Sequence, residues 1–160
     1  MPIYMNYDSL SVKGDATAAN WEGWVELNSF QFGVGRGISS PTGGSADRES
    51  SAPSVSEITI TKDQDSSTGP LLTAALQGEG VTVIIDFVKT SSGQLLKYME
   101  YTLTNTIISG WSTSSGGDRP SESISLNFTK VQVDPTTIDA TGNISNANPV
   151  TYDISTAKVV

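Results

Sequence analysis

The sequence predicts a mainly β fold, a two-sheet β-barrel or sandwich with one short flanking α-helix and a long extended loop. Several segments alternate apolar and polar residues with the period of strands, and only one has the spacing of a helix. Hydrophobic residues make up 36% of the chain and charged residues 16%, and Ser, Thr, Gly and Asn, which suit strands and turns, fill the difference. The 160 residues suit one domain with one core, spanning 1–160.

Three strand patterns lie in the first part of the chain. Residues 2–8, "PIYMNYD", alternate in the manner of a half-buried strand. Residues 22–35, "EGWVELNSFQFGVG", carry apolar residues on both faces, so this strand is expected either to be covered on both sides or to bend from one sheet to another. In "VSEITIT" (55–61), Ile58 and Ile60 share one face and polar residues occupy the other.

The helix is predicted over about 69–78, within "SSTGPLLTAALQGEG". Ser67 or Thr68 is the expected N-cap, Pro70 stands in the first turn, and Gly78 follows the last turn. At about two turns, the helix depends on packing for its stability. Its apolar stripe consists of Leu71, Leu72, Ala75 and Leu76.

The second half of the chain predicts further strands. "VTVIIDFVKT" (81–90) and "QLLKYMEYTLTNTII" (94–108) are joined by "SSG", which is typical of a hairpin. "SESISLNFTKVQVD" (121–134) predicts another strand, in which Ile124, Leu126 and Phe128 alternate with Ser123, Ser125, Asn127 and Thr129. A short last strand is expected near "PVTYDIS" (149–155).

Charge and composition exclude several functions. The net charge is −8 and the 9 Lys and Arg residues are scattered, which disfavours nucleic acid and anionic membranes as partners. The chain has no Cys and no His, so zinc sites, disulfides and His-based catalysis are excluded. The longest near-apolar run, "VTVIIDFV", is too short to span a bilayer. The first ten residues are not typical of a signal peptide, so we expect export, where it occurs, to bypass the general secretory route.

No segment gives a positive sign of catalysis or of a cofactor. "GVGRG" lacks the spacing of a dinucleotide loop, and "DQDSSTG" (63–69) lacks the Gly and the bidentate Glu of a calcium loop. "STAK" (155–158) has the spacing of a nucleophile and its base but lies in the last six residues. The carboxylates that could meet across strands are Glu22 with Glu26 and Glu100 with Glu122, and exposure is the default for them.

Five stretches, in order along nearly the whole chain, resemble the haemolysin-coregulated protein (Hcp) family, the tube-forming subunit of the bacterial type VI secretion system. The most distinctive covers residues 101–134, where "GGDRPSE" leads into the "SLNF" strand. The other four are residues 12–36, the Gly/Ser-rich loop, residues 58–78 and residues 139–155. "GDATAANWEG" (14–23) departs from the pattern of many members, which have a His before the first long strand.

The resemblance implies a homohexameric ring with a wide lumen, and rings that stack into a tube. It implies a contractile sheath around the tube and a VgrG-type spike trimer at its tip. Small effector proteins bound in the lumen are further implied partners, and neither chemistry nor a cofactor is implied. The subunit would assemble in the bacterial cytoplasm and be secreted without a signal peptide to the medium or to a target cell.

The loop between residues 33 and 54 is polar, rich in Gly and Ser, and longer than most structureless loops in compact domains. We interpret it as an arm that contacts neighbouring subunits, because a long polar segment can reach across and order on contact. The residues expected to let it bend are Gly33, Gly35, Gly37, Gly43 and Gly44. The residues expected to supply charge pairing are Arg36, Asp47, Arg48 and Glu49.

One strand face has the composition of a solvated lumen wall, being small, polar and uncharged. Its residues are Ser123, Ser125, Asn127 and Thr129. The alternative function is a monomeric β-sandwich module, for carbohydrate binding or adhesion, in which Trp21, Trp24 and Trp111 would stack on sugar rings. Oligomeric state discriminates between the two, since a sugar-binding module need not form rings.

Overall fold

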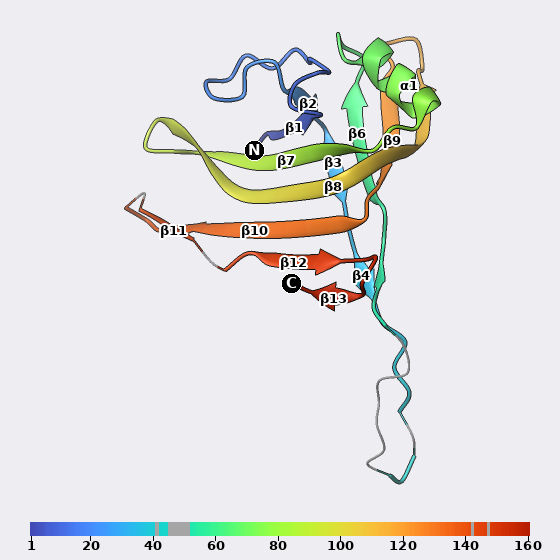
Figure 1. The fold of residues 1–160 in the computed structure, drawn as a ribbon. Coiled ribbons are helices and arrows are strands. Elements are labelled where there is room, and N and C mark those ends of the chain that lie inside the picture. The colour runs from blue at the N-terminus through green and yellow to red at the C-terminus, as the bar shows by residue number, and fades with distance from the viewer. Residues whose placement is uncertain (41, 45–51, 142, 147) are drawn as a thin grey trace.

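The fold was taken from a computed structural model, which describes residues 1–40, 42–44, 52–141, 143–146 and 148–160. These residues form strands and one helix, arranged as two sheets that share a long strand, together with a separate two-stranded ladder of β4 and β5 (Figure 1). In chain order the elements are β1 (Ile3–Tyr7), β2 (Val25–Leu27), β3 (Ser29–Gln31), β4 (Val34–Gly35), β5 (Ser54–Val55), β6 (Ile58–Asp63), α1 (Thr68–Gln77), β7 (Val81–Ser91), β8 (Gln94–Ser114), β9 (Ser121–Asn127), β10 (Lys130–Ile138), β11 (Ile144–Asn146), β12 (Val150–Asp153) and β13 (Lys158–Val159).

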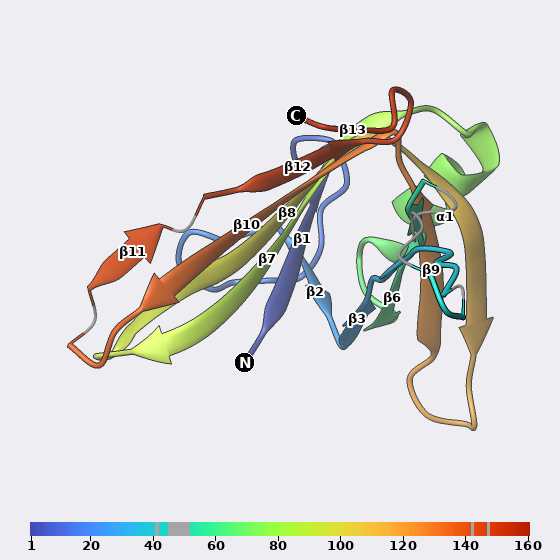
Figure 2. The same ribbon diagram turned by 90° about the horizontal axis from the view of Figure 1, so that it is seen from below.

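The first sheet, called the long sheet, has the order β13-β12-β10-β8-β7-β1-β2, with β11 paired to β10. The second, called the short sheet, consists of β3, β6, β9 and the second half of β8. All of these pairings are antiparallel. Figure 2 shows the two sheets diverging from the bend of β8 like the sides of a V, with the core between them. The predicted two-sheet β architecture with one short helix is confirmed.

Two bends join the sheets. β8 pairs with β7 and β10 through its first half and with β9 through its second half, and Asn105 between them has a φ of 53°, a left-handed conformation that Asn tolerates. The chain also passes from β2 in the long sheet to β3 in the short sheet at Asn28, whose N–H donates to the Thr61 carbonyl at 2.7 Å. Residues 22–35 therefore bend between sheets. The two sheets are not closed into a barrel at this side, since β2 and β3 belong to separate ladders and only the chain connects them.

The uniform strand predicted over 121–134 is wrong, because it is two strands in different sheets. β9 ends at Asn127 and β10 begins at Lys130. Phe128, at the corner, stays in the core with 5% of its surface exposed, and Thr129 donates its N–H to the Thr104 carbonyl at 3.1 Å. The apolar residues change phase at the corner, from Ile124, Leu126 and Phe128 to Val131 and Val133, and this shift marks the change of sheet.

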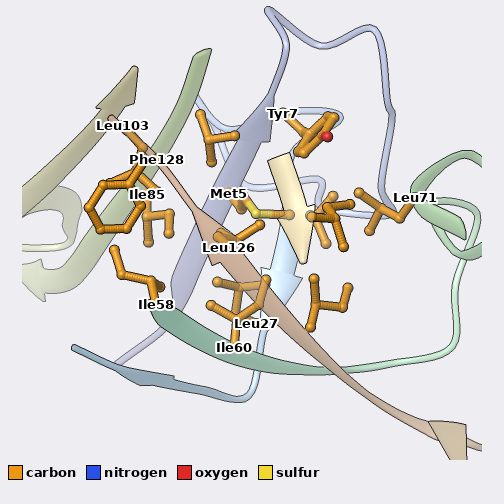
Figure 3. Packing of buried hydrophobic residues seen from close by; sticks show 14 of the residues in the cluster. Met5, Tyr7, Leu27, Ile58, Ile60, Leu71, Ile85, Leu103, Leu126 and Phe128 are labelled. Carbon is orange, nitrogen blue, oxygen red and sulfur yellow. The ribbon is translucent and has the colours of Figure 1, made fainter. Parts of the chain in front are cut away.

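The core lies between the two sheets and contains one residue from α1 (Figure 3). Alternate residues of each strand point into it, as the sequence periodicity predicts. Fully buried members come from both sheets and the helix, and include Met5, Val25, Ile58, Ile60, Leu71, Val83, Ile85, Leu103, Ile124 and Leu126. A second, smaller cluster on the outer face of the long sheet is made by Tyr4, Ala16, Trp21 and Val88.

The hairpin and the helix form close to where they were predicted. Ser92 and Gly93, with φ of 52° and 75°, join β7 to β8 in the two-residue turn that matches strand twist. α1 ends at Gly78, which has a φ of 70° and donates its N–H to the Ala74 carbonyl. The predicted apolar stripe is wrong in part: Leu71 is buried, but Leu72 is 36% exposed and Leu76 is 81% exposed.

Gly14 makes the closest backbone approach in the segment between β1 and β2, and it gives a first prediction. A Cβ at this position would lie 2.6 Å from the Trp24 carbonyl oxygen and 2.7 Å from the Val25 Cα. Gly14→Ala is therefore expected to lower the free energy of unfolding by about 2–3 kcal/mol, because backbone on both sides must shift. Urea denaturation measures the change. Gly35→Ala is the control, since a Cβ there meets nothing within 4 Å, and equal losses in the two variants would contradict the prediction.

Candidate functional site

The arm at residues 33–54 is paired at its base. β4 and β5 form a short antiparallel ladder in which Val34 lies opposite Val55. Gly33 and Ser56 extend this ladder by two hydrogen bonds, from the Gly33 N–H to Ser56 Oγ and from the Ser56 N–H to the Gly33 carbonyl, both 2.9 Å. The described part of the arm projects away from both sheets (Figure 1). The arm therefore has a fixed exit direction.

The residues predicted to act in the arm are only partly placed. Of the five glycines, Gly43 has a φ of 80°, a conformation that favours glycine, whereas Gly33, Gly35, Gly37 and Gly44 have no positive φ. Arg36 lines a groove at the base of the arm. Asp47, Arg48 and Glu49 lie outside the described residues.

An apolar groove of about 350 Å³ lies between the arm base and the edge of the long sheet. Three of its valines are largely exposed: Val34 by 61%, Val150 by 56% and Val159 by 74%. Exposed apolar surface gathered in one hollow is typical of an interaction site. The residues that line it are Phe32, Val34, Arg36, Pro53, Val55, Val131, Val133, Val150, Tyr152, Ala157 and Val159. Sequence reasoning missed this groove, since its walls are far apart in the chain.

The outer face of the short sheet is small, polar and uncharged in its central rows. Ile124, Leu126 and Phe128 point into the core, so Ser123, Ser125 and Asn127 stand on the opposite face of the chain. Cross-strand register extends this character over four strands, in the rows Ser29–Thr61–Ser123–Ser112 and Gln31–Thr59–Ser125–Gly110. Thr129, the fourth predicted member, lies beyond the end of β9.

A buried ion pair ties the two central strands of the short sheet together. Lys62 on β6 lies opposite Glu122 on β9, with 3.2 Å between Nζ and Oε1 and both side chains fully buried. Lys62 also contacts Asp65 Oδ1 at 3.0 Å and donates to the Asp63 carbonyl at 2.9 Å. The pairing of Glu122 with Glu100 that the sequence allowed does not form, because Glu122 lies opposite Lys62 and Glu100 lies opposite Asp86.

The same network holds the start of α1. The Thr68 hydroxyl donates to Glu122 Oε2 at 2.5 Å, and Asp65 Oδ1 accepts the Ser67 N–H at 2.8 Å. Burial raises the pKa of Asp65, but hydrogen bonds from Ser67 and Lys62 outweigh it and hold the pKa below its ordinary value. Ser67 is the N-cap residue yet makes no capping bond, because its hydroxyl donates to Asp65. The acidic turn therefore has a structural role, since it holds the start of α1 against β6 and β9.

The other sequence candidates for binding or chemistry are placed as follows. Glu22 and Glu26 are exposed, and Glu100 lies opposite Asp86. Trp21 is 6% exposed, and Trp24 and Trp111 are half-buried against apolar clusters, so none of the three is a fully exposed tryptophan of the kind assumed for sugar binding. Among the described residues, no group of three or more Asp or Glu could hold a metal ion, and no helix is long and apolar enough to cross a membrane.

Comparison with known proteins shows the relationship. The family model described as "Type VI secretion system effector, Hcp" matches residues 4–134. A solved type six secretion system protein is 23% identical with a TM-score of 0.89, covering 99% of each chain. Hcp1 from Salmonella typhimurium is 18% identical with a TM-score of 0.76, covering 99% of this chain and 98% of its own. Hcp3 from Pseudomonas aeruginosa is 17% identical with a TM-score of 0.63, covering 92% and 97%.

The comparison with curated proteins gives no match. The solved structures, at these identities, show that the fold is shared. The family model covers most of the chain, including four of the five segments that carry the resemblance noted in the sequence; residues 139–155 lie beyond the match. The chain belongs to the Hcp family of the type VI secretion system.

Proposed function

We propose that the protein is a structural subunit that closes head-to-tail into a homohexameric ring, and that the rings stack into the expelled inner tube of the secretion system. The observation that carries the proposal is the exposed apolar groove at the base of the arm. A protein that stayed monomeric would expose this surface to water at a cost, whereas a neighbouring copy would cover it.

Two further features support self-assembly. β13 and β2 end the long sheet, and an end strand presents unpaired backbone groups that a neighbour can pair or cover. The arm leaves the subunit beside the groove and in a fixed direction, which suits contact with an adjacent copy or ring. Arg36, with Asp47, Arg48 and Glu49, would set the register of that contact through charge.

The outer face of the short sheet is our candidate for the lumen wall. Its central hydroxyl-bearing rows hydrogen-bond with water and offer no charge to a passing polypeptide. Such a wall would accommodate small effector proteins without requiring a particular charge or sequence on their surface. In this function the subunit acts without catalysis or a cofactor, and its partners are its own copies, the spike trimer, the sheath and the effectors. Assembly would take place in the bacterial cytoplasm before export.

Light scattering on a sizing column, with negative-stain images of the same peak, tests the proposal. A particle of about six times 16.9 kDa, seen as a ring with a hole, is the expected result. A monomer at high concentration would contradict the proposed ring and favour the alternative of a monomeric carbohydrate-binding or adhesion module. Deletion of residues 41–49 then tests the arm, since an unchanged ring and an unchanged tube would exclude it from assembly.

A further inference from the structure

Two carboxyl groups face each other on the outer side of the long sheet, away from the groove and the core. Asp86 on β7 lies opposite Glu100 on β8, and Asp86 is 4% exposed. The Trp21 indole donates to Asp86 Oδ2 at 2.9 Å, whereas Oδ1 is buried and receives no donor from the part of the chain described. A proton held between Asp86 and Glu100 supplies the missing hydrogen bond, so the arrangement fits one proton shared by two carboxyls.

A β-bulge brings a cation beside the carboxyl pair. The register of β7 and β8 shifts between Phe87 and Val88, which brings Lys97 beside Glu100, with 2.8 Å between Nζ and Oε2. On one side, Glu100 lies opposite Asp134 of β10. On the other side, Asp86 lies opposite Tyr4 of β1, and Tyr4 lies opposite Glu26 of β2. Around Asp86 and Glu100 the described residues named here therefore supply four carboxyls and one ammonium, an excess of negative charge whenever every acid is ionised.

Asp86 is shielded from water by the segment between residues 13 and 24, which we call the cap. Trp21 stacks on Tyr4 with 5.9 Å between ring centroids, and these two residues form a small cluster with Ala16 and Val88, separate from the main core. The charged side chains of the cap itself, Lys13, Asp15 and Glu22, are exposed. The cap thus closes over the carboxyl pair by apolar packing and one indole hydrogen bond to the acid.

We propose that the cap is a pH-dependent element, closed when Asp86 and Glu100 share a proton and opening when both are ionised. An ionised Asp86 needs water, and water reaches it only if Trp21 and Tyr4 move away. A secreted subunit that passes from neutral to more acidic surroundings would close its cap more tightly.

The direction follows from the two states of the cap. In the closed state, burial and the hydrogen bond with Glu100 raise the pKa of Asp86 to about 7, against the opposing effects of Trp21 and Lys97. In the open state Asp86 is hydrated and titrates near its ordinary value of about 4. The opening constant therefore rises by up to about tenfold for each pH unit between these values and levels off above pH 7. Burial raises the pKa of Glu100, but its bonds with Asp86 and Lys97 lower it overall, so the titration that drives opening is that of Asp86.

Hydrogen exchange of the Trp21 indole N–H, followed by NMR between pH 5 and 8, measures the opening directly. We expect its protection factor, which already corrects for the intrinsic pH dependence of exchange, to fall by at least tenfold from pH 5 to pH 7.5. Asp86→Asn should abolish the fall, because the amide accepts from Trp21 and donates to Glu100 but cannot ionise. Glu100→Gln should move the midpoint to lower pH by removing the like charge.

Three results would overturn the proposal. The first is a flat protection factor in the unmodified protein, and the second is the same fall in Asp86→Asn or, should that variant not fold, an unmoved midpoint in Glu100→Gln. The third is a parallel fall at the backbone amides of Ile85 and Leu103, which would show global unfolding in place of cap opening. Glu26→Gln is the matched control: it removes an exposed carboxylate of the same face, and the fall should persist.

Discussion

Replacing Glu122 by alanine is expected to lower the free energy of unfolding by about 3–5 kcal/mol, because the buried Lys62 loses its partner on β9. Lys62 keeps Asp65 and the Asp63 carbonyl, but the charge on β6 loses its contact with β9. The Thr68 hydroxyl loses its acceptor as well, which loosens the start of α1. Urea denaturation followed by circular dichroism measures the loss.

A double-mutant cycle separates the ion pair from simple loss of packing. Lys62→Met and Glu122→Leu should each cost several kcal/mol, while the double variant should recover much of that loss, because apolar side chains of similar volume replace both charges. Asp65 retains its bonds from Ser67 in the double variant. Additive losses would show that the two residues act independently. Glu22→Ala, at an exposed position, is the control and should change stability by less than about 0.5 kcal/mol.

The sequence contained a signal for this buried ion pair in the positions of the two charges within the alternation. Lys62 follows Ile58 and Ile60 in phase, and Glu122 precedes Ile124 and Leu126 in phase. Each charge thus stands at a position where its strand places a core residue, and opposite charges at core-facing positions of two strands indicate a buried pair. The sequence analysis assumed that Glu122 is exposed, as strand carboxylates usually are, and therefore did not predict the pair.

Strand and helix positions were predictable because local periodicity and turn chemistry decide them. The Ser92–Gly93 hairpin, the end of α1 at Gly78 and the alternation of β6 and β9 all follow from short stretches of sequence. The change of sheet at Thr129 was missed, although the apolar residues shift phase there, from Phe128 to Val131 and Val133. Short strands such as β4 and β13 form because they pair with β5 and β12. A two-residue segment is too short to show an alternation in the sequence, so these strands were not predicted.

The candidate site was predictable in part. The arm was located by its composition, and the polar face of β9 by its alternation. The groove and the cap over Asp86 were not, because their walls come from segments more than sixty residues apart, such as Trp21 with Asp86. Family resemblance supplied the proposed kind of assembly, and the residues proposed to make its contacts depend on the three-dimensional surface of this chain.

Introducing a charge into the groove is the change expected to have the largest effect on assembly. Val150 is 56% exposed in the free subunit and lines the groove, so Val150→Glu leaves the fold intact but places a carboxylate where a neighbouring copy would pack. Burying that charge without a partner costs several kcal/mol, which weakens association by about 100-fold or more. The variant should elute as a folded monomer at concentrations where the unmodified chain forms rings.

Ile144→Glu provides the matched comparison, because Ile144 is 55% exposed and does not line the groove. Light scattering should show rings for Ile144→Glu and monomers for Val150→Glu, with similar melting temperatures for both. If both variants assemble as the unmodified chain does, the groove faces solvent in the ring and a different surface joins the subunits. If both remain monomeric, the interface extends over β11 as well as β12, and the groove is only one part of it. Loss of assembly in Val150→Glu alone would assign the ring contact to the surface where the arm meets the edge of the long sheet.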